Sequence, residues 1–357
     1  RPEALGAMQQ QWQEVGNPSS LHTAGRRARR VVEESREQIA AIVGAKPADI
    51  IFTSGGTEAD NLALKGLARN TDRRRVLVSA VEHHAVLDPA DALADEAKTV
   101  ELIPVDAQGR VDVAALELML DDDVAVVAVM WANNEVGTEQ PVAQIAQMCA
   151  ARGVPFHTDA VQALGQLDLD LEGIPSAALS AHKVGGPVGV GALVLDRDLS
   201  VRPLVHGGGQ ERDVRSGTLD AAGIAGFAAA LAADKPDLAP LRDRLIDGVR
   251  RVVPDAVLNG DPVDRLPNNA HFSFPGCPGD ALLMLLDAAG VAVSTGSACT
   301  AGIPQPSHVL MAMGADEPLA RSSLRFSLGW NSTDDDVAAL LTALPAVVER
   351  ARRAGGM

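Results

Sequence analysis

Residues 49–69 read DIIFTSGGTEADNLALKGLAR, and this stretch decides the fold class. Its apolar run, from Ile50 to Phe52, is short enough for a buried strand, and it is followed by two glycines. From Thr57 onward, leucines and alanines recur at helical spacing. A strand, a tight turn and a helix in direct succession form the unit from which α/β sheets are built.

The same alternation continues along the chain. Strand-like runs occur in RRRVLVSAVEHH (73–84), DDDVAVVAVMWANNE (121–135) and VPFHTDAVQALG (154–165), while PVAQIAQMCAARG (141–153) predicts a helix. We therefore expect an α/β domain with a large, mostly parallel sheet and helices on both faces. After about residue 238 an amphipathic helix and short strands follow, so we expect a smaller α+β C-terminal domain beginning near residue 236.

Composition limits the function. With 357 residues, 46% of them hydrophobic and 22% charged, the chain is expected to be a soluble protein of two domains. The net charge of −16 argues against direct binding of nucleic acid or of an anionic membrane. The sequence shows neither a membrane-spanning run nor a signal peptide. Its three cysteines are widely spaced, which predicts a reducing, cytoplasmic setting and no intrinsic metal site.

Unusual polar groups follow the predicted strands. They are Ser54-Gly55-Gly56-Thr57, Glu82-His83-His84, Asn133-Asn134-Glu135, Asp159 with Gln162, and Ser180-His182-Lys183. Ligands of open α/β sheets bind at the carboxyl ends of the strands. We therefore expect these groups to form one site at that edge of the sheet.

Lys183 is the most informative of these residues. It lies in LSAHKVGGPVGVGALVL (179–195), a run otherwise made of small or apolar residues and one histidine. One interpretation is a lysine at a strand end whose ammonium reaches water. The other is a desolvated amine with a lowered pKa, able to form a Schiff base with a carbonyl.

Each of the other groups also allows two interpretations. The glycine turn before Thr57 suits a phosphate at a helix N-terminus, or Thr57 is simply the helix N-cap. Asp159 is a turn former or the partner of a protonated pyridine nitrogen. His83 could stack on a flat ring and transfer protons. Asn134 and Gln162 are neutral donors suited to a phenolic oxygen.

The segment STGSACTAGIPQP (294–306) carries Cys299 among small and helix-breaking residues, which predicts an exposed, mobile loop. Cys299 is therefore the best candidate nucleophile. Cys149 lies among apolar residues and is expected to be structural, while Cys277 is ambiguous. In SSLRFSLGW (322–330), Arg325 could bind a substrate carboxylate through two hydrogen bonds, or be a strand arginine with no such role.

Together these motifs resemble the pyridoxal-phosphate-dependent cysteine desulfurases of the NifS/IscS type. The resemblance runs from about Pro2 to Trp330. It is carried in order by GNPSSLHTAGR, FTSGGTEADNLAL, EHHAVLDP, NNEVGTEQPV, HTDAVQALG, SAHKVGGPVGVGAL, GGGQERDVRSGTLD, STGSACTAG and SSLRFSLGW.

The resemblance implies the aminotransferase-like architecture called fold type I, in a homodimer. Residues 16–235 would form the large cofactor-binding domain, and residues 1–15 and 236–357 the small one. Lys183 would bind pyridoxal phosphate covalently, and Cys299 would take the sulfur as a persulfide. The other implied site residues are Gly56, Thr57, His83, Asn134, Asp159, Gln162, Ser180, His182 and Thr218 for the cofactor, and Asn17 and Arg325 for the substrate.

The implied reaction converts L-cysteine to L-alanine and passes the sulfur to an iron–sulfur scaffold protein or another acceptor. The resemblance also raises the question of whether Cys299 ligates an iron–sulfur cluster shared with that scaffold. The alternatives are a selenocysteine lyase or another class V aminotransferase or lyase, neither of which needs a persulfide on Cys299. A non-catalytic member with a vestigial site is the third alternative.

Overall fold

The computed structural model describes residues 1–296 and 305–355. These residues form two compact units. The large unit comprises residues 1–103, 113–131 and 141–234, and the small unit comprises residues 104–112, 132–140 and 235–357. The chain leaves the large unit for the last time after Asp234, one residue before the predicted boundary between 235 and 236. Two short segments of the small unit, 104–112 and 132–140, are inserted in the sequence of the large one, which the sequence did not indicate.

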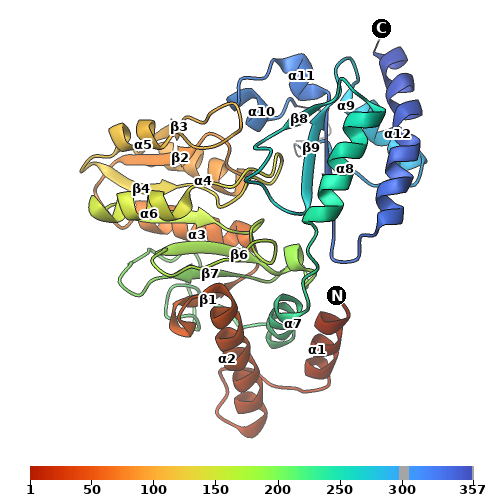
Figure 1. Ribbon diagram of the computed structural model, residues 1–357. Helices are drawn as coiled ribbons and strands as arrows, with labels where there is room; N and C mark the ends of the chain where they lie inside the picture. Colours follow the sequence, from red (N-terminus) through yellow and green to blue (C-terminus); the bar gives the residue numbers. More distant parts are fainter. Residues whose placement is uncertain (297–304, 356–357) are drawn as a thin grey trace. The chain divides into compact units, whose positions relative to one another are not determined.

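The large unit alternates strands and helices, as its apolar runs predict (Figure 1). Its strands are β1 (Ile50–Thr53), β2 (Arg75–Ser79), β3 (Thr99–Ile103), β4 (Val124–Ala128), β5 (Phe156–Asp159), β6 (Ser176–Ser180) and β7 (Gly191–Leu195). Its helices are α1 (Pro2–Trp12), α2 (Thr23–Val43), α3 (Gly56–Ala68), α4 (His84–Ala94), α5 (Val113–Met119), α6 (Val142–Ala151) and α7 (Ala221–Ala232), with short 3₁₀ turns η1 (Pro47–Asp49) and η2 (Ala181–Val184).

These strands form one seven-stranded sheet in the order β1-β7-β6-β5-β4-β2-β3. Only β7 runs antiparallel to its neighbours, β1 and β6. The other six strands point the same way, so their carboxyl ends meet at one edge of the sheet. This is the mostly parallel α/β sheet that the alternating pattern predicts.

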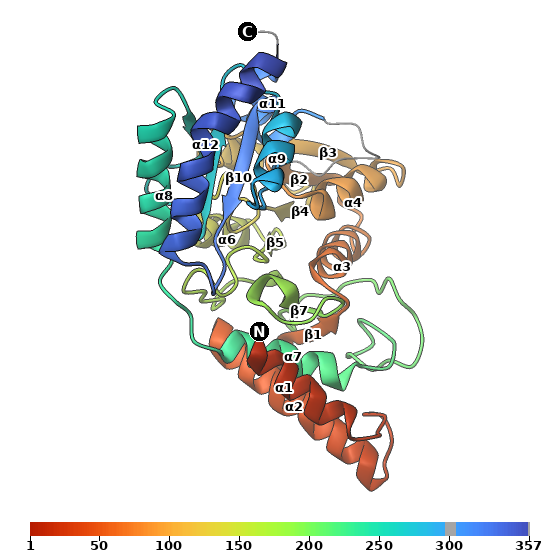
Figure 2. The ribbon, with the colours of Figure 1, turned by 90° about the vertical axis from the view of Figure 1, so that its right-hand side faces the viewer.

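The helices cover both faces of this sheet. Strands such as β4 and β6 are buried at every position, as expected for strands covered on two faces. Helix α3 packs across β4, β5, β6 and β7 through Ala59, Leu62 and Ala63. Helix α6 contacts β5 from the opposite face (Figures 1 and 2).

The N-terminal helix α1 belongs to the large unit. The resemblance assigned residues 1–15 to the small domain, and the structure corrects this. Helix α1 packs along α7, with Ala4 buried between them, and the amino group of Arg1 donates to the Gly185 carbonyl oxygen at 2.7 Å. Apolar contact with α7 therefore holds this helix on the large unit.

The small unit is built on a three-stranded antiparallel sheet in the order β10-β9-β8. Its strands are β8 (Val257–Asn259), β9 (Asn269–Ser273) and β10 (Ser323–Ser327), and its helices are α8 (Ala239–Val252), α9 (Gly279–Ala288), α10 (His308–Ala312), α11 (Glu317–Arg321) and α12 (Asp334–Ala354). Phe272, Phe274 and Phe326 form an aromatic cluster in its core. Helix α12 packs against α8 and α9 (Figure 2).

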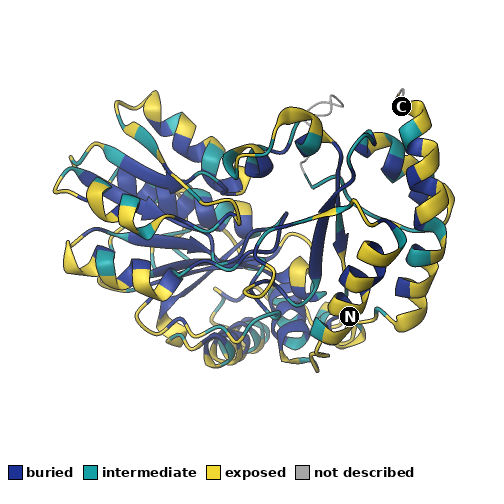
Figure 3. Cartoon of the chain, turned by 45° about the horizontal axis from the view of Figure 1, so that its top comes forward, coloured by how far each residue is buried: buried dark blue, intermediate teal, exposed yellow. Residues whose placement is uncertain are grey.

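The burial of side chains differs between the strands and the helices. The central strands of the large sheet, such as β4 and β6, are buried along their whole length, while helices such as α8 and α12 keep one exposed face (Figure 3). Within residues 1–296 and 305–355, none of the helices has the length and apolar character needed to cross a membrane.

Candidate active site

Five polar groups of the large unit lie at the carboxyl edge of its sheet. The glycine turn follows β1, His83 follows β2, Asp159 ends β5, and Lys183 follows β6. Gln162 lies in the turn just after Asp159 and is half-buried. Since these strands are parallel, their ends bring together residues as distant in the sequence as Gly55 and Lys183, which are 128 positions apart.

The glycine turn is held too tightly for larger residues. A Cβ atom on Gly56 would lie 2.7 Å from Val161 Cγ2, and one on Gly191 would lie 2.6 Å from Gly55 Cα. Gly55 is the N-cap of α3 with φ of 152°, so the alternative in which Thr57 caps the helix is wrong. The first N–H groups of this 13-residue helix, including that of Thr57, are directed out of its N-terminus.

Lys183 lies on η2, directly after β6. The residue is exposed, which agrees with a lysine whose ammonium reaches water and not with a desolvated amine, because the run of small residues around it is a turn and not a core strand. Beside it, Ser180 Oγ is 2.9 Å from His182 Nδ1. Partial burial lowers the pKa of His182, and the charge of Lys183 lowers it further.

Asp159 is buried at the end of β5. Its Oδ1 accepts a hydrogen bond from the Val161 N–H at 2.9 Å. Burial, together with the nearby Asp60 carboxyl, raises the pKa of Asp159 to about 8, although the charge of Lys183 opposes this rise. A buried carboxyl of this kind is stabilised as a carboxylate when a cationic partner faces it.

His83 is exposed and is the N-cap residue of α4. Its Nδ1 accepts a hydrogen bond from the Ala85 N–H at 3.0 Å, which in the neutral ring assigns the proton to Nε2. The backbone therefore fixes both the orientation and the tautomer of this imidazole. An exposed ring held in this way can stack on a flat ligand and exchange a proton at Nε2.

These residues fit pyridoxal phosphate. The tight turn at Gly55 and Gly56 opens onto the positive end of α3, which suits a phosphate. Asp159 is a buried acid of raised pKa, which a protonated pyridine nitrogen would hold ionised. Lys183 supplies the amine that an aldehyde requires.

Thr218 lies on an exposed segment of the large unit that two ion pairs hold in place. Arg215 Nε donates to Glu58 Oε1 at 2.8 Å, and Glu211 forms a bidentate pair with Arg36 at 2.8 Å for each bond. Thr218 follows three residues after Arg215, so its position is set by these pairs.

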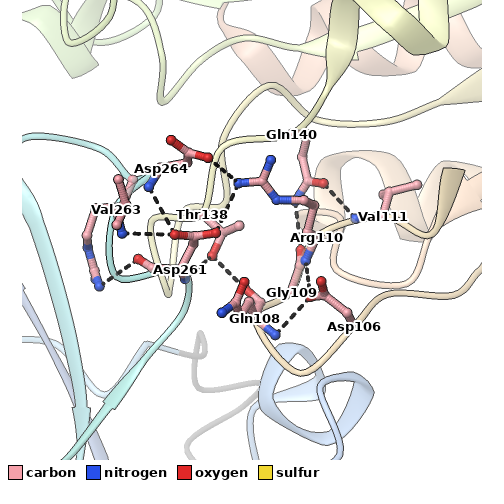
Figure 4. Close-up of polar contacts among 11 residues, drawn as sticks. Asp106, Gln108, Gly109, Arg110, Val111, Thr138, Gln140, Asp261, Val263 and Asp264 are labelled. Carbon is pink, nitrogen blue, oxygen red and sulfur yellow. Dashed lines mark hydrogen bonds and ion pairs between the residues drawn. The ribbon is translucent and has the colours of Figure 1, made fainter.

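Asn134 belongs to the small unit, on the segment 132–140. Figure 4 shows how this segment is tied to its surroundings. Arg110 pairs with Asp261 at 3.0 Å and with Asp264 at 2.9 Å, and the Thr138 hydroxyl donates to the Gln108 carbonyl oxygen at 2.6 Å. Because these bonds link three chain segments, the loop that carries Asn134 is held firmly within the small unit.

Arg325, on β10, donates from one terminal guanidinium nitrogen to the Asn134 carbonyl oxygen at 2.7 Å. Its Nε is buried and has no hydrogen-bond partner within the described parts of the chain. Burial lowers the pKa of Arg325, and the adjacent Glu135 counteracts this effect only in part. The guanidinium therefore keeps donor capacity for a carboxylate ligand.

The comparisons with known proteins agree with this arrangement. The model of the family "Aminotransferase class-V" matches residues 1–340. An IscS-like cysteine desulfurase of Mycobacterium tuberculosis is 53% identical, over 99% of this chain and 94% of that protein. The chain belongs to the class V aminotransferase family, among the cysteine desulfurases of the IscS and NifS type.

Solved structures of desulfurase-like proteins share its architecture. A NifS-like protein superposes with a TM-score of 0.90 at 34% identity, covering 98% of this chain and 96% of that one. A second structure, SspA in complex with cysteine, gives a TM-score of 0.82 at 31% identity, covering 93% and 96%. Class V aminotransferases use pyridoxal phosphate, the cofactor that the residues of the large unit fit.

One site residue predicted from the family resemblance, Asn17, is not part of these clusters, and the position of another is not described. Cys299 lies outside the described residues. Asn17 is an exposed turn residue whose Oδ1 accepts the Ser19 N–H at 2.9 Å, and the loop 13–22 lies at the end of α2 remote from the sheet (Figure 1). Cys149 and Cys277 are both buried, and burial raises the pKa of the Cys149 thiol to about 12.

The sequence reasoning gave no individual role to several residues that lie near the predicted site residues. Asp60 and His157 form a buried pair below Asp159. In the small unit, Glu135 accepts a hydrogen bond from Ser307 Oγ at 2.5 Å, and a Cβ on Gly296 would lie 3.1 Å from Glu135 Oε2. Glu135 therefore lies close to Gly296 and Ser307, which stand before and after the segment of Cys299 in the sequence. Glu135 follows the predicted site residue Asn134 and His157 lies two residues before Asp159, whereas no signal in the sequence pointed to Asp60.

Proposed function

We propose that this chain is a pyridoxal-phosphate-dependent enzyme that converts L-cysteine to L-alanine and takes the sulfur onto Cys299 as a persulfide. The observation that carries the proposal is the grouping of Lys183, Asp159 and the turn at Gly56 at one edge of the sheet. Membership of the cysteine desulfurases supplies the reaction class. The structure of the relative in complex with cysteine supports cysteine as the substrate.

Each of these residues would contact a different part of the cofactor. Asp159 faces the ring nitrogen, His83 stacks on the ring, and Lys183 provides the covalent attachment. Gln162 contacts the oxygen side of the ring, and Asn134, from the small unit, is proposed for the same side. The residues proposed for the phosphate are Gly56, Thr57, Ser180, His182 and, from the partner subunit of a homodimer, Thr218.

When bound, pyridoxal phosphate supplies an aldehyde carbon and an electron-accepting ring. The protein residues then bind the substrate and move protons. Arg325 binds the substrate carboxylate, and Lys183 moves a proton at the substrate Cα, with His83 as a further acid or base. Proton transfer by a positioned group contributes about 10²–10⁴ in rate. Lys183 is an exposed residue on the turn that follows β6.

Cys299 would perform the sulfur transfer. Its thiolate attacks the substrate sulfur and forms the S–S bond of the persulfide. The substrate Cβ–S bond breaks, and its electron pair remains with the substrate carbon, which takes up a proton to become alanine. The persulfide then passes to an iron–sulfur scaffold protein or another acceptor, and we propose the reducing cytoplasm as the compartment.

The decisive experiment supplies the purified protein with pyridoxal phosphate and L-cysteine and measures alanine and sulfide together. We expect equal amounts of alanine and sulfide in the presence of a thiol reductant. Cys299→Ser should abolish sulfide release and keep the visible absorbance of the bound cofactor. Lys183→Ala should abolish that absorbance.

Other outcomes would identify a different enzyme. Full sulfide release by Cys299→Ser would contradict sulfur transfer through this thiol and favour a selenocysteine lyase or another class V lyase. Uptake of no cofactor by the wild-type chain would indicate a vestigial site and refute the proposal.

A further inference from the structure

Three buried polar side chains, Asp60, His157 and Ser176, form a hydrogen-bonded network next to Asp159 in the sheet. The proposed function above assigns them no role. His157, two residues before Asp159 on β5, has Nε2 3.0 Å from Asp60 Oδ1 and Nδ1 2.8 Å from Ser176 Oγ. Asp60 comes from α3 and Ser176 from β6, so three elements meet at this imidazole. Asp60 is 1% exposed, and His157 and Ser176 are fully buried.

The two carboxyl oxygens of Asp60 have different surroundings. Oδ1 faces His157, whereas Oδ2 is buried with no hydrogen-bond partner in the part of the chain that the structure describes. An ionised carboxylate with one unsolvated oxygen is far less stable there than a neutral carboxylic acid. With a proton on Oδ1, Asp60 donates to His157 Nε2, and His157 Nδ1–H donates to Ser176. Each hydrogen bond then has one donor and one acceptor.

The ionisable groups around this network favour the same assignment. Burial raises the pKa of Asp60 well above its ordinary value and lowers the pKa of His157 to about 4. A negative charge on Asp60 raises the pKa of both Asp159 and Glu82, because like charges in one buried site disfavour each other. The charge of Lys183 favours the ionised form of Asp159. A single negative charge in this region is therefore best placed on Asp159.

We propose that Asp60 is a positioning residue that stays protonated, donates a hydrogen bond to His157, and so leaves Asp159 to carry the negative charge that faces the cofactor's ring nitrogen. The inference rests on the proposed function, since it assigns Asp60 and His157 to the support of a cofactor-binding carboxylate. Asparagine is the matched replacement for a protonated Asp60. Its amide N–H can donate to His157 Nε2, it fills nearly the same volume, and it carries no charge.

The first test uses the protein without cofactor and measures its unfolding temperature from pH 5 to pH 8. In the unfolded chain Asp60 ionises near its ordinary pKa, whereas the folded chain keeps the proton. The wild type therefore loses stability as pH rises, and Asp60→Asn removes this loss. We expect Asp60→Asn to unfold at higher temperature than the wild type, with the gain growing by about 3 °C per pH unit. A lower unfolding temperature at pH 8 would show that Asp60 is ionised and overturn the proposal.

Glu58, two residues earlier on α3, is the matched control. Burial alone would raise the pKa of Glu58, but the hydrogen bonds from Arg215 and Ser54 outweigh it and hold the pKa below its ordinary value. Glu58→Gln should therefore destabilise the protein most at neutral pH, with the loss shrinking as pH falls toward 4. The two substitutions thus have opposite signs and opposite pH trends, and identical behaviour of both would also overturn the proposal.

The second test uses the cofactor-loaded protein and a spectroscopic readout. The absorbance of the bound cofactor is recorded as a function of pH, and the pH at the midpoint of its change is compared with that of the wild type. We expect this midpoint to move by less than about 0.3 pH units in Asp60→Asn, because the substitution removes no charge. Asp60→Ala leaves His157 Nε2 without its donor, and we expect about tenfold weaker cofactor binding. A midpoint shift of about one unit in Asp60→Asn would overturn the assignment.

The two tests separate this inference from the proposed function. A chain that binds no cofactor refutes the proposed function, and the role of Asp60 is lost with it. If the cofactor binds normally and Asp60→Asn lowers the unfolding temperature, this inference fails alone.

Discussion

Replacing Glu211 by alanine removes the group that closes the free edge of the large sheet. Strand β1 is the outermost strand, and Glu211 Oε2 accepts the outward-facing N–H of Phe52 at 2.7 Å. The same carboxylate receives two hydrogen bonds of 2.8 Å from Arg36, whose guanidinium also donates to the Ile50 carbonyl oxygen at 2.7 Å. The Glu211 side chain is 2% exposed, so water does not replace these bonds easily.

The structure sets the size of the effect. Breaking a buried ion pair by removing one partner costs about 3–5 kcal/mol, and an unpaired buried N–H costs about 1–3 kcal/mol. Arg36 keeps two other partners, Glu33 at 3.0 Å and the Ile50 carbonyl oxygen, which offset part of this loss. We therefore expect Glu211→Ala to lower the free energy of unfolding by about 4 kcal/mol. For a unit of this size the unfolding temperature should fall by about 10 °C.

Calorimetry of the cofactor-free protein checks this value. Glu14→Ala is the control, because Glu14 pairs with Arg27 at 3.4 Å on the exposed surface of the same unit, where such pairs contribute under about 1 kcal/mol. Equal losses for Glu211→Ala and Glu14→Ala would refute the argument that burial and the backbone bond decide the strength of the Glu211 pair.

Three further predictions follow from features of the two units. Gly56→Ala should weaken binding of pyridoxal phosphate at least tenfold, because its Cβ would enter the space of the Val161 side chain. Gly6→Ala on α1, where an added Cβ meets no atom within 4 Å, should leave binding unchanged. Equilibrium dialysis measures the binding of both variants. Ser307→Ala removes a 2.5 Å hydrogen bond to Glu135 and the N-cap of α10. Urea unfolding should therefore show that the free energy of unfolding falls by about 2 kcal/mol. A fall below about 0.5 kcal/mol would contradict this. Burial lowers the pKa of His271 to about 3. The unfolded chain binds a proton there below about pH 6.5, whereas the folded chain does not. The free energy of unfolding should therefore fall as pH drops from about 6.5 to about 3, and it should fall less in His271→Gln.

The fold and the strand-end residues could be predicted because their signals are local. The run from Ile50 to Phe52, the two glycines and the helical spacing after them determine β1, the turn and α3 without reference to the rest of the chain. Asp159 could be placed at the site for a similar reason. It ends an apolar run, and the ends of parallel strands meet at one edge.

The remaining features depend on contacts between distant segments. Asp60 is one polar residue among many on a helix, and only the packing of α3 on β5 shows that it is buried against His157. The segment 104–112 joins the small unit through Arg110, whose partner Asp261 is 151 residues away. The sequence left the surroundings of Lys183 undecided, because small residues occur both in cores and in turns, and composition alone does not separate the two.

The burial of Cys149 and Cys277 matters for an enzyme whose cargo is sulfur. A persulfide exchanges readily with any thiolate that it meets, and such exchange would scatter the sulfur within the chain. Burial raises the pKa of both thiols, so neither is an effective nucleophile at neutral pH. Under the proposed function, in which Cys299 carries the persulfide, neither of these two thiols would compete for its sulfur, which would be left for an external acceptor.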